Sequence, residues 1–444
     1  MIINYRKLAS SRLRSDALDI LVAGIESALP GDAMQKNISF SKGILKVYGD
    51  RFDASRGRIY VIGFGKASAA MAKALEKIIP PKSIAVGIVN CSIDTVKTKK
   101  VRVNKASHPV PDKKGAAGLE KMLEIAKNAG KNDIVICLVS GGGSALLPDP
   151  AGRITLNDLK KMTELMLKSG AKSYELNNLR KHTSRFKGGN LARVIQPAKV
   201  ISLILSDVIN ENDVTASGPT SPDNSTFKQS YDVLKKYDLL EKMPRSIISH
   251  LKGGMRGNVP ETAKPGEKFL KNVHNYILAD YRTALNSMRK KASELGFDAE
   301  ILPNHTEGEV KTVAGKMAEL FRQKGSLHKK KFALIYSSEN RVTVSGNGKG
   351  GRSQEYIGYL IKEIKDFGNC VAASIDSDGT DFLPGVGGAI SDSSTYSKSQ
   401  KMNIDIGIFL KNNNSFELHK RLNTLILMKP TNTNVGDINV YLRG

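Results

Sequence analysis

Short apolar runs alternate with amphipathic segments through the first half of the chain. Four of these runs are almost continuously apolar and rich in β-branched residues, at 58–64, 83–89, 133–140 and 199–206. Such runs are typical of strands that are buried on both faces in a parallel sheet. The segments at 67–79, 116–129 and 156–170 carry apolar residues at helical spacing. The first half is therefore predicted to be a doubly wound α/β domain with a mostly parallel sheet.

A second series of strands and helices follows a segment at 217–271 that is rich in Gly, Pro and polar residues. Strands are predicted at 273–279, 297–302, 331–337, 341–346, 369–376 and 424–429, and helices at 281–294, 307–324 and 353–366. We place the boundary near residue 240. This gives an N-terminal Rossmann-like domain at 1–240 and a smaller C-terminal α/β domain at 241–444, with the last strand segment able to pack back on the first domain.

Length and composition agree with a two-domain globular protein. Of the 444 residues, 40% are hydrophobic and 25% are charged, which excludes a disordered or fibrous chain. The three cysteines, Cys91, Cys137 and Cys370, are too few and too far apart for a disulfide framework or a Cys-x-x-Cys metal site. The sequence contains no run of roughly 20 apolar residues and no signal peptide. We expect a cytoplasmic protein that is not embedded in a membrane.

The chain is strongly basic, with 68 Lys and Arg against 43 Asp and Glu and a formal net charge of +25. This charge raises the concentration of anions near the surface, so nucleic acid, acidic membranes and phosphorylated metabolites are all compatible partners. The lysines are scattered in short groups, as at 99–100, 113–114 and 329–331, and aromatic residues for base stacking make up only 6%. The lysines are therefore interpreted as a solvated surface rather than as a nucleic-acid site.

Two glycine-containing loops follow predicted strands in the first half, at the position where open α/β sheets bind ligands. The loop at 63–68 places Lys66 at the start of a predicted helix, although Tyr60 and Ser68 replace glycines of the Walker and Rossmann motifs. The second loop runs Ser140, Gly141, Gly142, Gly143 and Ser144. Successive amides in such a loop form a nest suited to a triphosphate, and the alternative for either loop is an ordinary connecting turn.

Further polar residues lie between 177 and 213. Lys181 and Arg185 are four residues apart and are expected on one helical face, where with Asn178 they form a candidate anion site. Asp207 leaves a buried strand directly, so it is a candidate Mg²⁺ ligand or a base for a substrate hydroxyl. His108 is isolated in the sequence and is interpreted as a structural, hydrogen-bonded residue.

Two clusters stand out in the second half. The first precedes a predicted helix and contains Gly348, Lys349 and Gly350. Arg352 follows it and offers a bidentate fork for the oxygens of a transferring phosphoryl group. The second cluster, at 376–381, holds three carboxylates that repel one another unless a cation or water separates them, and Asp378 is a candidate metal ligand. Gly387 stands where an EF-hand loop needs Glu, so a calcium loop is not expected.

Taken together, these motifs resemble those of the MOFRL family of glycerate kinases over nearly the entire chain. The segments that carry the resemblance are GFGKASAAMA, SHPVPD, LVSGGGSALL, NNLRKHTSRFKGGNLA, LILSDVINENDVTASGPTSPD, VTVSGNGKGGRSQE, DSDGTDFLPGVGGAISD and PTNTNVGDINVYL. The resemblance implies transfer of the ATP γ-phosphoryl group to D-glycerate, giving 2-phosphoglycerate, with a divalent metal and a site in the cleft between domains. Lys66 and Arg352 match charged active-site positions of the family. The chain departs from the family pattern at 338–341 and at Ser353, which bears on substrate selectivity.

We therefore expect a kinase with ATP and Mg²⁺ as cofactors and D-glycerate as its small-molecule substrate. Lys66 and Arg352 are assigned to the transferring group, and Asp207 is assigned as the base or a metal ligand. The ATP phosphates are assigned to residues 140–144, together with Gly348, Lys349 and Gly350. Substrate binding is assigned to Asn178, Lys181 and Arg185. A homodimer is compatible with the sequence.

Two other functions are weighed against this one. An oxidoreductase acting on hydroxypyruvate or tartronate with NAD(P)H would also use glycine-rich loops after strands, but it needs an acidic residue to bind the ribose. Asn90 occupies the expected position of that residue. A basic nucleic-acid-binding protein is the third function, and its affinity would fall steeply with salt.

Overall fold

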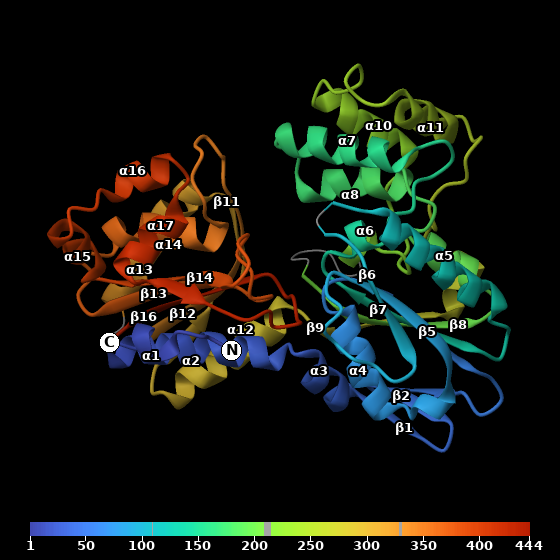
Figure 1. The fold of residues 1–444 in the computed structure, drawn as a ribbon, viewed down its shortest axis with the longest axis horizontal. Coiled ribbons are helices and arrows are strands. Elements are labelled where there is room, and N and C mark those ends of the chain that lie inside the picture. The colour runs from blue at the N-terminus through green and yellow to red at the C-terminus, as the bar shows by residue number, and fades with distance from the viewer. Residues whose placement is uncertain (109, 208–214, 328–330) are drawn as a thin grey trace. The chain divides into compact units, whose positions relative to one another are not determined.

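The computed structural model describes residues 1–108, 110–207, 215–327 and 331–444. The chain forms two compact units (Figure 1). The central unit comprises Ala33–Leu278, and the terminal unit combines Met1–Asp32 with Ala279–Gly444. The predicted boundary near residue 240 falls inside the central unit. The reason is that the chain from 217 to 278 packs against the first sheet and its helices rather than leading to a new core.

The central unit is built on a six-stranded sheet with the order β6-β5-β4-β7-β8-β9. Its strands are β4 (Ile59–Phe64), β5 (Ile84–Cys91), β6 (Val101–Lys105), β7 (Ile134–Ser140), β8 (Lys199–Leu205) and β9 (Val273–Ala279). The pairs from β6 through β8 are all parallel. Every residue of β4 and β7 is buried, as their continuous apolar character predicts. The α/β fold with a parallel sheet is thus confirmed, with β9 joining this sheet at its edge.

The helices of the central unit include two that connect parallel strands, α4 (Ser68–Ile78) and α5 (Lys113–Asn128). A separate group of four helices lies together at the top of this unit in Figure 1, namely α7 (Leu156–Lys168), α8 (Ser173–His182), α10 (Phe227–Lys236) and α11 (Arg245–Met255). These helices share one hydrophobic core that includes Met162, Leu179, Phe227 and Leu251. The sequence pattern had left the last two helices unassigned.

The terminal unit contains a mixed sheet with the order β10-β12-β16-β13-β14-β15, and β11 also pairs with β12. Its strands are β10 (Asp298–Ile301), β11 (Thr306–Glu309), β12 (Phe332–Arg341), β13 (Cys370–Asp376), β14 (Val386–Asp392), β15 (Leu425–Leu427) and β16 (Asp437–Arg443). The last strand lies at the centre of this sheet, antiparallel to both β12 and β13. Such a position was not evident because β16 pairs with strands far away in the sequence.

Four helices of the terminal unit are long, namely α2 (Arg12–Ser27), α12 (Tyr281–Glu294), α13 (Val310–Leu327) and α14 (Arg352–Glu363). The first two pack closely, since a Cβ added at Gly24 would meet the Met288 side chain at 2.8 Å. The predicted strand at 341–346 is wrong, because β12 ends at Arg341 and the chain beyond it bonds to another loop.

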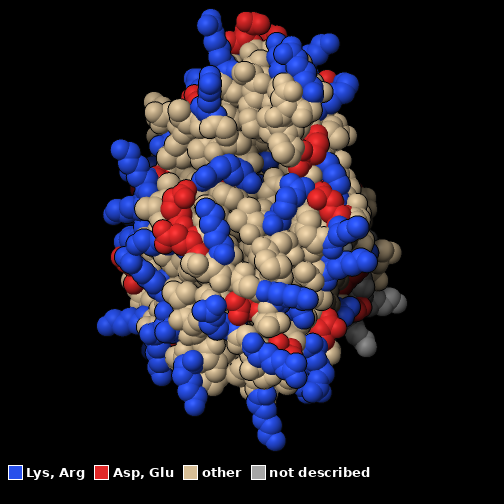
Figure 2. Space-filling model, turned by 90° about the vertical axis from the view of Figure 1, so that its right-hand side faces the viewer, with Lys and Arg blue, Asp and Glu red and all other residues tan. Residues whose placement is uncertain are grey.

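The remaining elements are short: α1 (Tyr5–Leu8), α3 (Pro30–Asn37), β1 (Ile38–Ser41), β2 (Ile44–Val47), β3 (Asp50–Asp53), α6 (Gly143–Leu146), α9 (Asn190–Ile195), α15 (Thr395–Lys401), α16 (Ile406–Lys411) and α17 (Ser415–Leu422). Within the described part of the chain, no helix has the length and apolar character needed to cross a bilayer. On the face shown in Figure 2, Lys and Arg side chains are spread among acidic and uncharged residues rather than gathered in one patch.

Candidate functional site

The two glycine-containing loops of the central unit lie side by side. Their strands, β4 and β7, are parallel neighbours, so both loops begin at the same edge of the sheet. The amide of Lys66 donates a hydrogen bond to the carbonyl of Gly141 at 2.9 Å. The amide of Ala67 donates to the hydroxyl of Ser140 at 3.0 Å. The two loops that the sequence predicts at the ligand-binding ends of strands are thus neighbours in the structure.

Gly142 is the point of closest packing in this site. Its φ of 77° lies in the left-handed region, which favours glycine. A Cβ at this position would lie 2.9 Å from the ring of His108 and 3.2 Å from Cγ of Lys66. Burial, with Lys66 and Arg180 nearby, lowers the pKa of His108 to about 4. The His108 ring is therefore neutral at physiological pH and packs against the glycine backbone beside a lysine.

The amides of this loop are available for a ligand. Within the described residues, no acceptor receives the amide hydrogens of Gly142, Gly143 or Ser144. The Ser144 hydroxyl lies 2.9 Å from that of Ser217, which in turn donates to the side chain of Asn177 at 3.2 Å. Successive unpaired amides beside a lysine are the arrangement that binds phosphate oxygens. The loop thus fits the anion site predicted for residues 140–144.

Arg180 on α8 is a functional candidate that the sequence analysis missed. It lines a cavity of about 400 Å³ together with Ser144. Its guanidinium approaches the Asn177 side chain at 3.5 Å, and no described carboxylate forms an ion pair with it. Burial lowers its pKa to about 10. A largely desolvated cation without a carboxylate is costly unless an anion binds there, so Arg180 is well suited to hold one.

The neighbouring cations that were predicted to bind substrate have other partners. Nζ of Lys181 lies 3.0 Å from Oδ1 of Asp223, and both side chains are buried. Helix α8 ends at His182, so Arg185 does not lie on the same helical face as Lys181 and that expectation is wrong. Arg185 is exposed and forms an ion pair with Glu120 at 3.0 Å.

The remaining predicted residues of this unit are placed as follows. Asn178 is half-buried on α8, and its carbonyl accepts a hydrogen bond from the Ser230 hydroxyl at 3.1 Å. Asp207 follows β8, at the same sheet edge as the glycine loops. The rest of the acidic loop that was singled out there, at 208–214, lies outside the described residues.

In the terminal unit, Arg352 is held by two carboxylates. Its Nε lies 2.5 Å from Asp437, and its Nη2 lies 2.8 Å from Asp437 and 3.3 Å from Asp376. Asp437 is the principal cause of a raised Arg352 pKa. Three of the five guanidinium hydrogens are used in this way, and the two on Nη1 have no acceptor among the described residues. Asp437 lies in the motif PTNTNVGDINVYL, and nothing in that motif by itself indicates a contact with Arg352, which is remote in the sequence.

The carboxylate cluster at 376–381 resolves its repulsion through separate partners. Asp376 pairs with Arg352, and Asp378 accepts a hydrogen bond from the amide of Thr380 at 2.7 Å. Asp381 accepts the amides of Ser353 and Gln354 at the start of α14, at 3.1 and 2.8 Å. Burial raises the pKa of Asp381 to about 6. The start of α14 is thus capped by a carboxylate of the protein itself.

The glycine-rich turn before α14 packs against the loop at 412–415. The amide of Gly348 donates to the carbonyl of Asn412 at 2.9 Å, and the amide of Lys349 donates to the Asn414 side chain at 3.3 Å. A Cβ at Gly350 would meet the hydroxyl of Ser415. These glycines therefore allow close packing of two loops. The amides of Gly348 and Lys349 already have acceptors within the protein, and the assignment of this turn to the ATP phosphates stays a prediction.

No group of three or more His, Cys, Asp and Glu side chains suited to a metal ion occurs among the described residues. Mg²⁺ is commonly held by one or two carboxylates plus the phosphates of a substrate, so this finding is compatible with a metal that binds together with a nucleotide. It leaves Asp207 and Asp378 as single candidate ligands.

Known proteins align with this chain over almost its whole length. Residues 16–252 match a domain of unknown function, DUF4147, and residues 332–437 match the MOFRL family. A glycerate 2-kinase of Pyrococcus horikoshii is 37% identical over 431 residues, covering 96% of each chain. The crystal structure of a glycerate kinase of Thermotoga maritima aligns with a TM-score of 0.80 at 31% identity, covering 96% of this chain and 98% of that one. A protein of Agrobacterium vitis with the provisional name hydroxypyruvate reductase is 33% identical over 88% of each chain.

These matches confirm the resemblance to the MOFRL family that the sequence motifs indicated. The chain therefore belongs to the family of glycerate kinases that combine a DUF4147 domain with a MOFRL domain.

Proposed function

We propose that the protein transfers the γ-phosphoryl group of ATP to the 2-hydroxyl of D-glycerate, giving 2-phosphoglycerate. Relatives with this activity in their names align over nearly the full chain, at 37% identity in the case of the Pyrococcus protein. The single observation that carries the proposal is the loop at 142–144, whose amides have no acceptor in the described chain and which lies beside Lys66. Such a loop binds phosphate oxygens, as a kinase requires.

The central unit supplies the groups that hold the donor phosphates. The amides of Gly142, Gly143 and Ser144 surround one anion position, and Lys66 adds a positive charge. Arg180 supplies a second cation, whose desolvation is not compensated by an ion pair with any carboxylate of the described residues. Phosphoryl transfer depends mainly on positioning and on charge neutralisation, and these groups provide both.

Arg352 is proposed to neutralise charge on the transferring phosphoryl group, together with Lys66. Asp437 and Asp376 fix the guanidinium and leave Nη1 to bind an oxygen. Holding the Arg352 guanidinium in place beforehand matters, because a preorganised cation needs no reorganisation when charge develops on the phosphoryl group. Asp207 is proposed as the base for the acceptor hydroxyl or as a metal ligand.

A divalent cation, Mg²⁺, is proposed to bind with the nucleotide. Asp207 of the central unit and Asp378 of the terminal unit are each a candidate ligand, in addition to phosphate oxygens. The cation would supply neutralisation of charge between the donor phosphates. Titration of activity with Mg²⁺ and with EDTA measures this dependence directly.

One assay tests reaction class, substrate and regiochemistry together. Purified protein is incubated with ATP, Mg²⁺ and D-glycerate, and the products are followed by ³¹P NMR, which separates 2-phosphoglycerate from 3-phosphoglycerate. The expected result is ATP-dependent formation of the 2-isomer. Formation of only the 3-isomer, or ADP release that does not depend on glycerate, contradicts the proposal.

A reductase acting on hydroxypyruvate is the second candidate, because the Agrobacterium relative carries that provisional name. The position of the ribose-binding acid is occupied by Asn90, which is fully buried. Its side chain donates to the carbonyls of Gly115 and Leu146 at 2.9 and 2.8 Å, so it serves the packing of the unit. We expect no oxidation of NADH or NADPH with hydroxypyruvate, measured by absorbance at equal protein concentration.

A further inference from the structure

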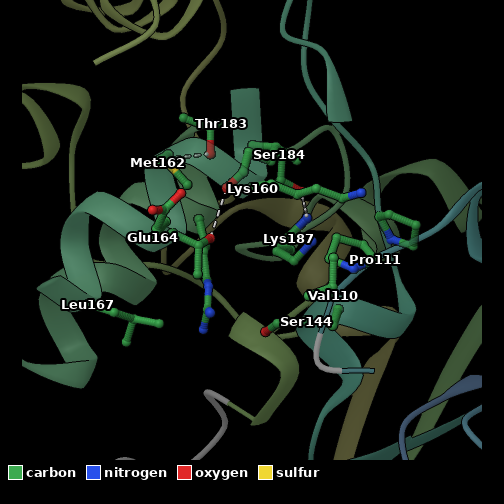
Figure 3. Close-up of a pocket in the computed structure, with 15 residues that line it drawn as sticks. Val110, Pro111, Ser144, Lys160, Met162, Glu164, Leu167, Thr183, Ser184 and Lys187 are labelled. Carbon is green, nitrogen blue, oxygen red and sulfur yellow. Dashed lines mark hydrogen bonds between the residues drawn. The ribbon is translucent and has the colours of Figure 1, made fainter. Parts of the chain in front are cut away.

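A cavity of about 400 Å³ opens beside the phosphate loop of the central unit. Most of its wall is apolar and comes from α7, from the segment after His108 and from the chain after the glycine loop. These apolar lining residues are Val110, Pro111, Ala145, Pro148, Leu159, Met162 and Leu167. Figure 3 shows Leu167 on one side of the cavity and Val110 and Pro111 on the other, with Ser144 below them.

Two of these apolar side chains are left unusually exposed. The exposed fraction of Val110 is 54% and that of Leu167 is 64%, although both belong to the wall of a concave site. Exposed apolar side chains around a cavity mark a surface that a ligand covers. The cavity therefore favours a ligand with apolar faces.

The polar residues of the lining come from several elements. Ser144 and Arg180 belong to the site proposed to hold phosphate. Lys160, Thr163 and Glu164 come from α7, and Thr183, Ser184 and Lys187 complete the polar lining. A flat ligand with apolar faces, polar edges and an anionic end matches this distribution.

The buried lysine of the wall is already neutralised and does not compete for an anion. Lys187 forms an ion pair with Asp149, and its Nζ also donates to the carbonyl of Leu147 at 2.9 Å. The Ser184 hydroxyl donates to the same aspartate. This network fixes the wall, whereas Arg180 forms no ion pair with a carboxylate of the described residues.

A three-carbon hydroxy acid fits the cavity poorly. Every carbon of D-glycerate carries oxygen, so apolar walls would remove its water without replacing the hydrogen bonds. The base of a nucleotide has apolar faces and hydrogen-bonding edges, and the phosphates extend from the ribose to one side only. The apolar wall thus favours the nucleotide over D-glycerate as the substrate that occupies this cavity.

We infer that this cavity binds the base and ribose of the phosphate-donor nucleotide, with its phosphates on the loop at 142–144 and Arg180. The inference rests on the proposed function in that the donor is ATP. Leu159, Met162 and Leu167 contact one face of the base, Val110 and Pro111 the other, and Lys160 and Glu164 lie near its edge.

Calorimetric titration without glycerate tests the inference, with ADP and inorganic tripolyphosphate as the two probes. Ala145 is half-buried in the wall, and its amide donates to the carbonyl of Gly142, so Ala145→Leu is chosen to fill part of the cavity while the backbone of the phosphate loop is kept. We expect the Kd of ADP to rise by at least about tenfold. The Kd of tripolyphosphate, which has no base, should stay within about twofold of the wild-type value. Equal ADP affinity in a folded Ala145→Leu variant overturns the inference.

Leu167→Ala provides a second variant that should fold, because its side chain is largely exposed. It is expected to weaken ADP and to leave tripolyphosphate unchanged. Photolabelling of the wild-type protein with 2-azido-ADP is a further test that needs no substitution. Label on the peptides that contain 110–111 or 159–167 supports the inference, and label confined to other peptides overturns it.

The two proposals fail in distinguishable ways. If ADP binding depends on Ala145 but no 2-phosphoglycerate forms, the proposed reaction is wrong and the nucleoside cavity stands. If 2-phosphoglycerate forms but the Kd of ADP is unchanged in both cavity variants, the cavity assignment is wrong and the proposed kinase reaction is retained. Absence of any ADP binding to the wild-type protein overturns the cavity assignment.

Discussion

Substitution of Gly142 by alanine tests the central claim that this glycine lets Lys66 and His108 pack against the phosphate loop. The matched control is Gly257→Ala, because the two glycines have nearly the same φ, 77° and 79°. A Cβ at Gly257 has no neighbour within 4 Å, whereas one at Gly142 lies 2.9 Å from His108 and 3.2 Å from Lys66. Comparison of the two variants therefore distinguishes the effect of backbone strain, which both share, from the effect of displacing Lys66 and His108, which only Gly142→Ala has.

The expected magnitudes follow from these contacts. An alanine in the left-handed region costs roughly 1–2 kcal/mol, partly offset by about 0.4–1 kcal/mol from reduced freedom of the unfolded chain. Gly257→Ala should therefore lose about 1 kcal/mol and keep its activity. Gly142→Ala should lose a further 1–3 kcal/mol or so from overpacking, and its kcat/KM should fall by at least about tenfold because the cation moves.

Thermal unfolding and initial-rate kinetics of the two variants, measured side by side, give both quantities. A loss of about 1 kcal/mol corresponds to roughly 2–4 °C in Tm for a domain of this size. If Gly142→Ala is as active as Gly257→Ala, the packing of Lys66 and His108 against this glycine has no bearing on catalysis, and the reasoning is refuted.

The other predictions concern the charged groups. Lys66→Ala and Arg352→Ala should each lower kcat by at least about 10²-fold in folded protein, as removal of charge-stabilising groups does, and near-normal turnover would reject that role. Asp437→Asn should lower kcat/KM by about tenfold or more by releasing the Arg352 fork, with Asp437→Glu recovering part of the loss in the same rate assay. Burial, with Glu309 and Asp381 nearby, raises the pKa of Glu355 from 4.5 to about 7, so the folded state binds this proton more tightly than the unfolded state. The stability that this group contributes is present below about pH 4.5 and is lost as the pH rises through about 7. Glu355→Gln should therefore raise the Tm relative to wild type at about pH 8 and not at about pH 5. Equal differences in Tm at both pH values would contradict the shifted pKa.

Some of the candidate site could be predicted from sequence because the signal is local. Three glycines after a continuous apolar strand indicate a loop at a sheet edge, and the structure leaves the amides of Gly142, Gly143 and Ser144 without acceptors. The turn at 346–350 has a similar composition and yet packs against the loop at 412–415. Composition does not distinguish the two loops, since the difference lies in which distant segment reaches each amide.

The cations show the same limit. Arg180, Lys181 and Arg185 stand within six positions in the sequence, and nothing in their spacing marks Arg180 as the one that lines the cavity. Lys181 is neutralised by Asp223, which is remote in the sequence and lies outside α8. Which carboxylate pairs with which cation depends on tertiary packing between distant segments, so it cannot be predicted from the local sequence.

The sequence by itself determined the parallel sheet of the central unit, the positions of most helices and the family, because each of these depends on local hydrophobic period or on contiguous motifs. The tertiary structure decided the rest. It placed β9 on the first sheet and β16 at the centre of the second, joined Arg352 to Asp437, and selected Arg180 over its neighbours. Each of these depends on contacts between residues far apart in the chain, and such contacts leave no periodic trace in the sequence.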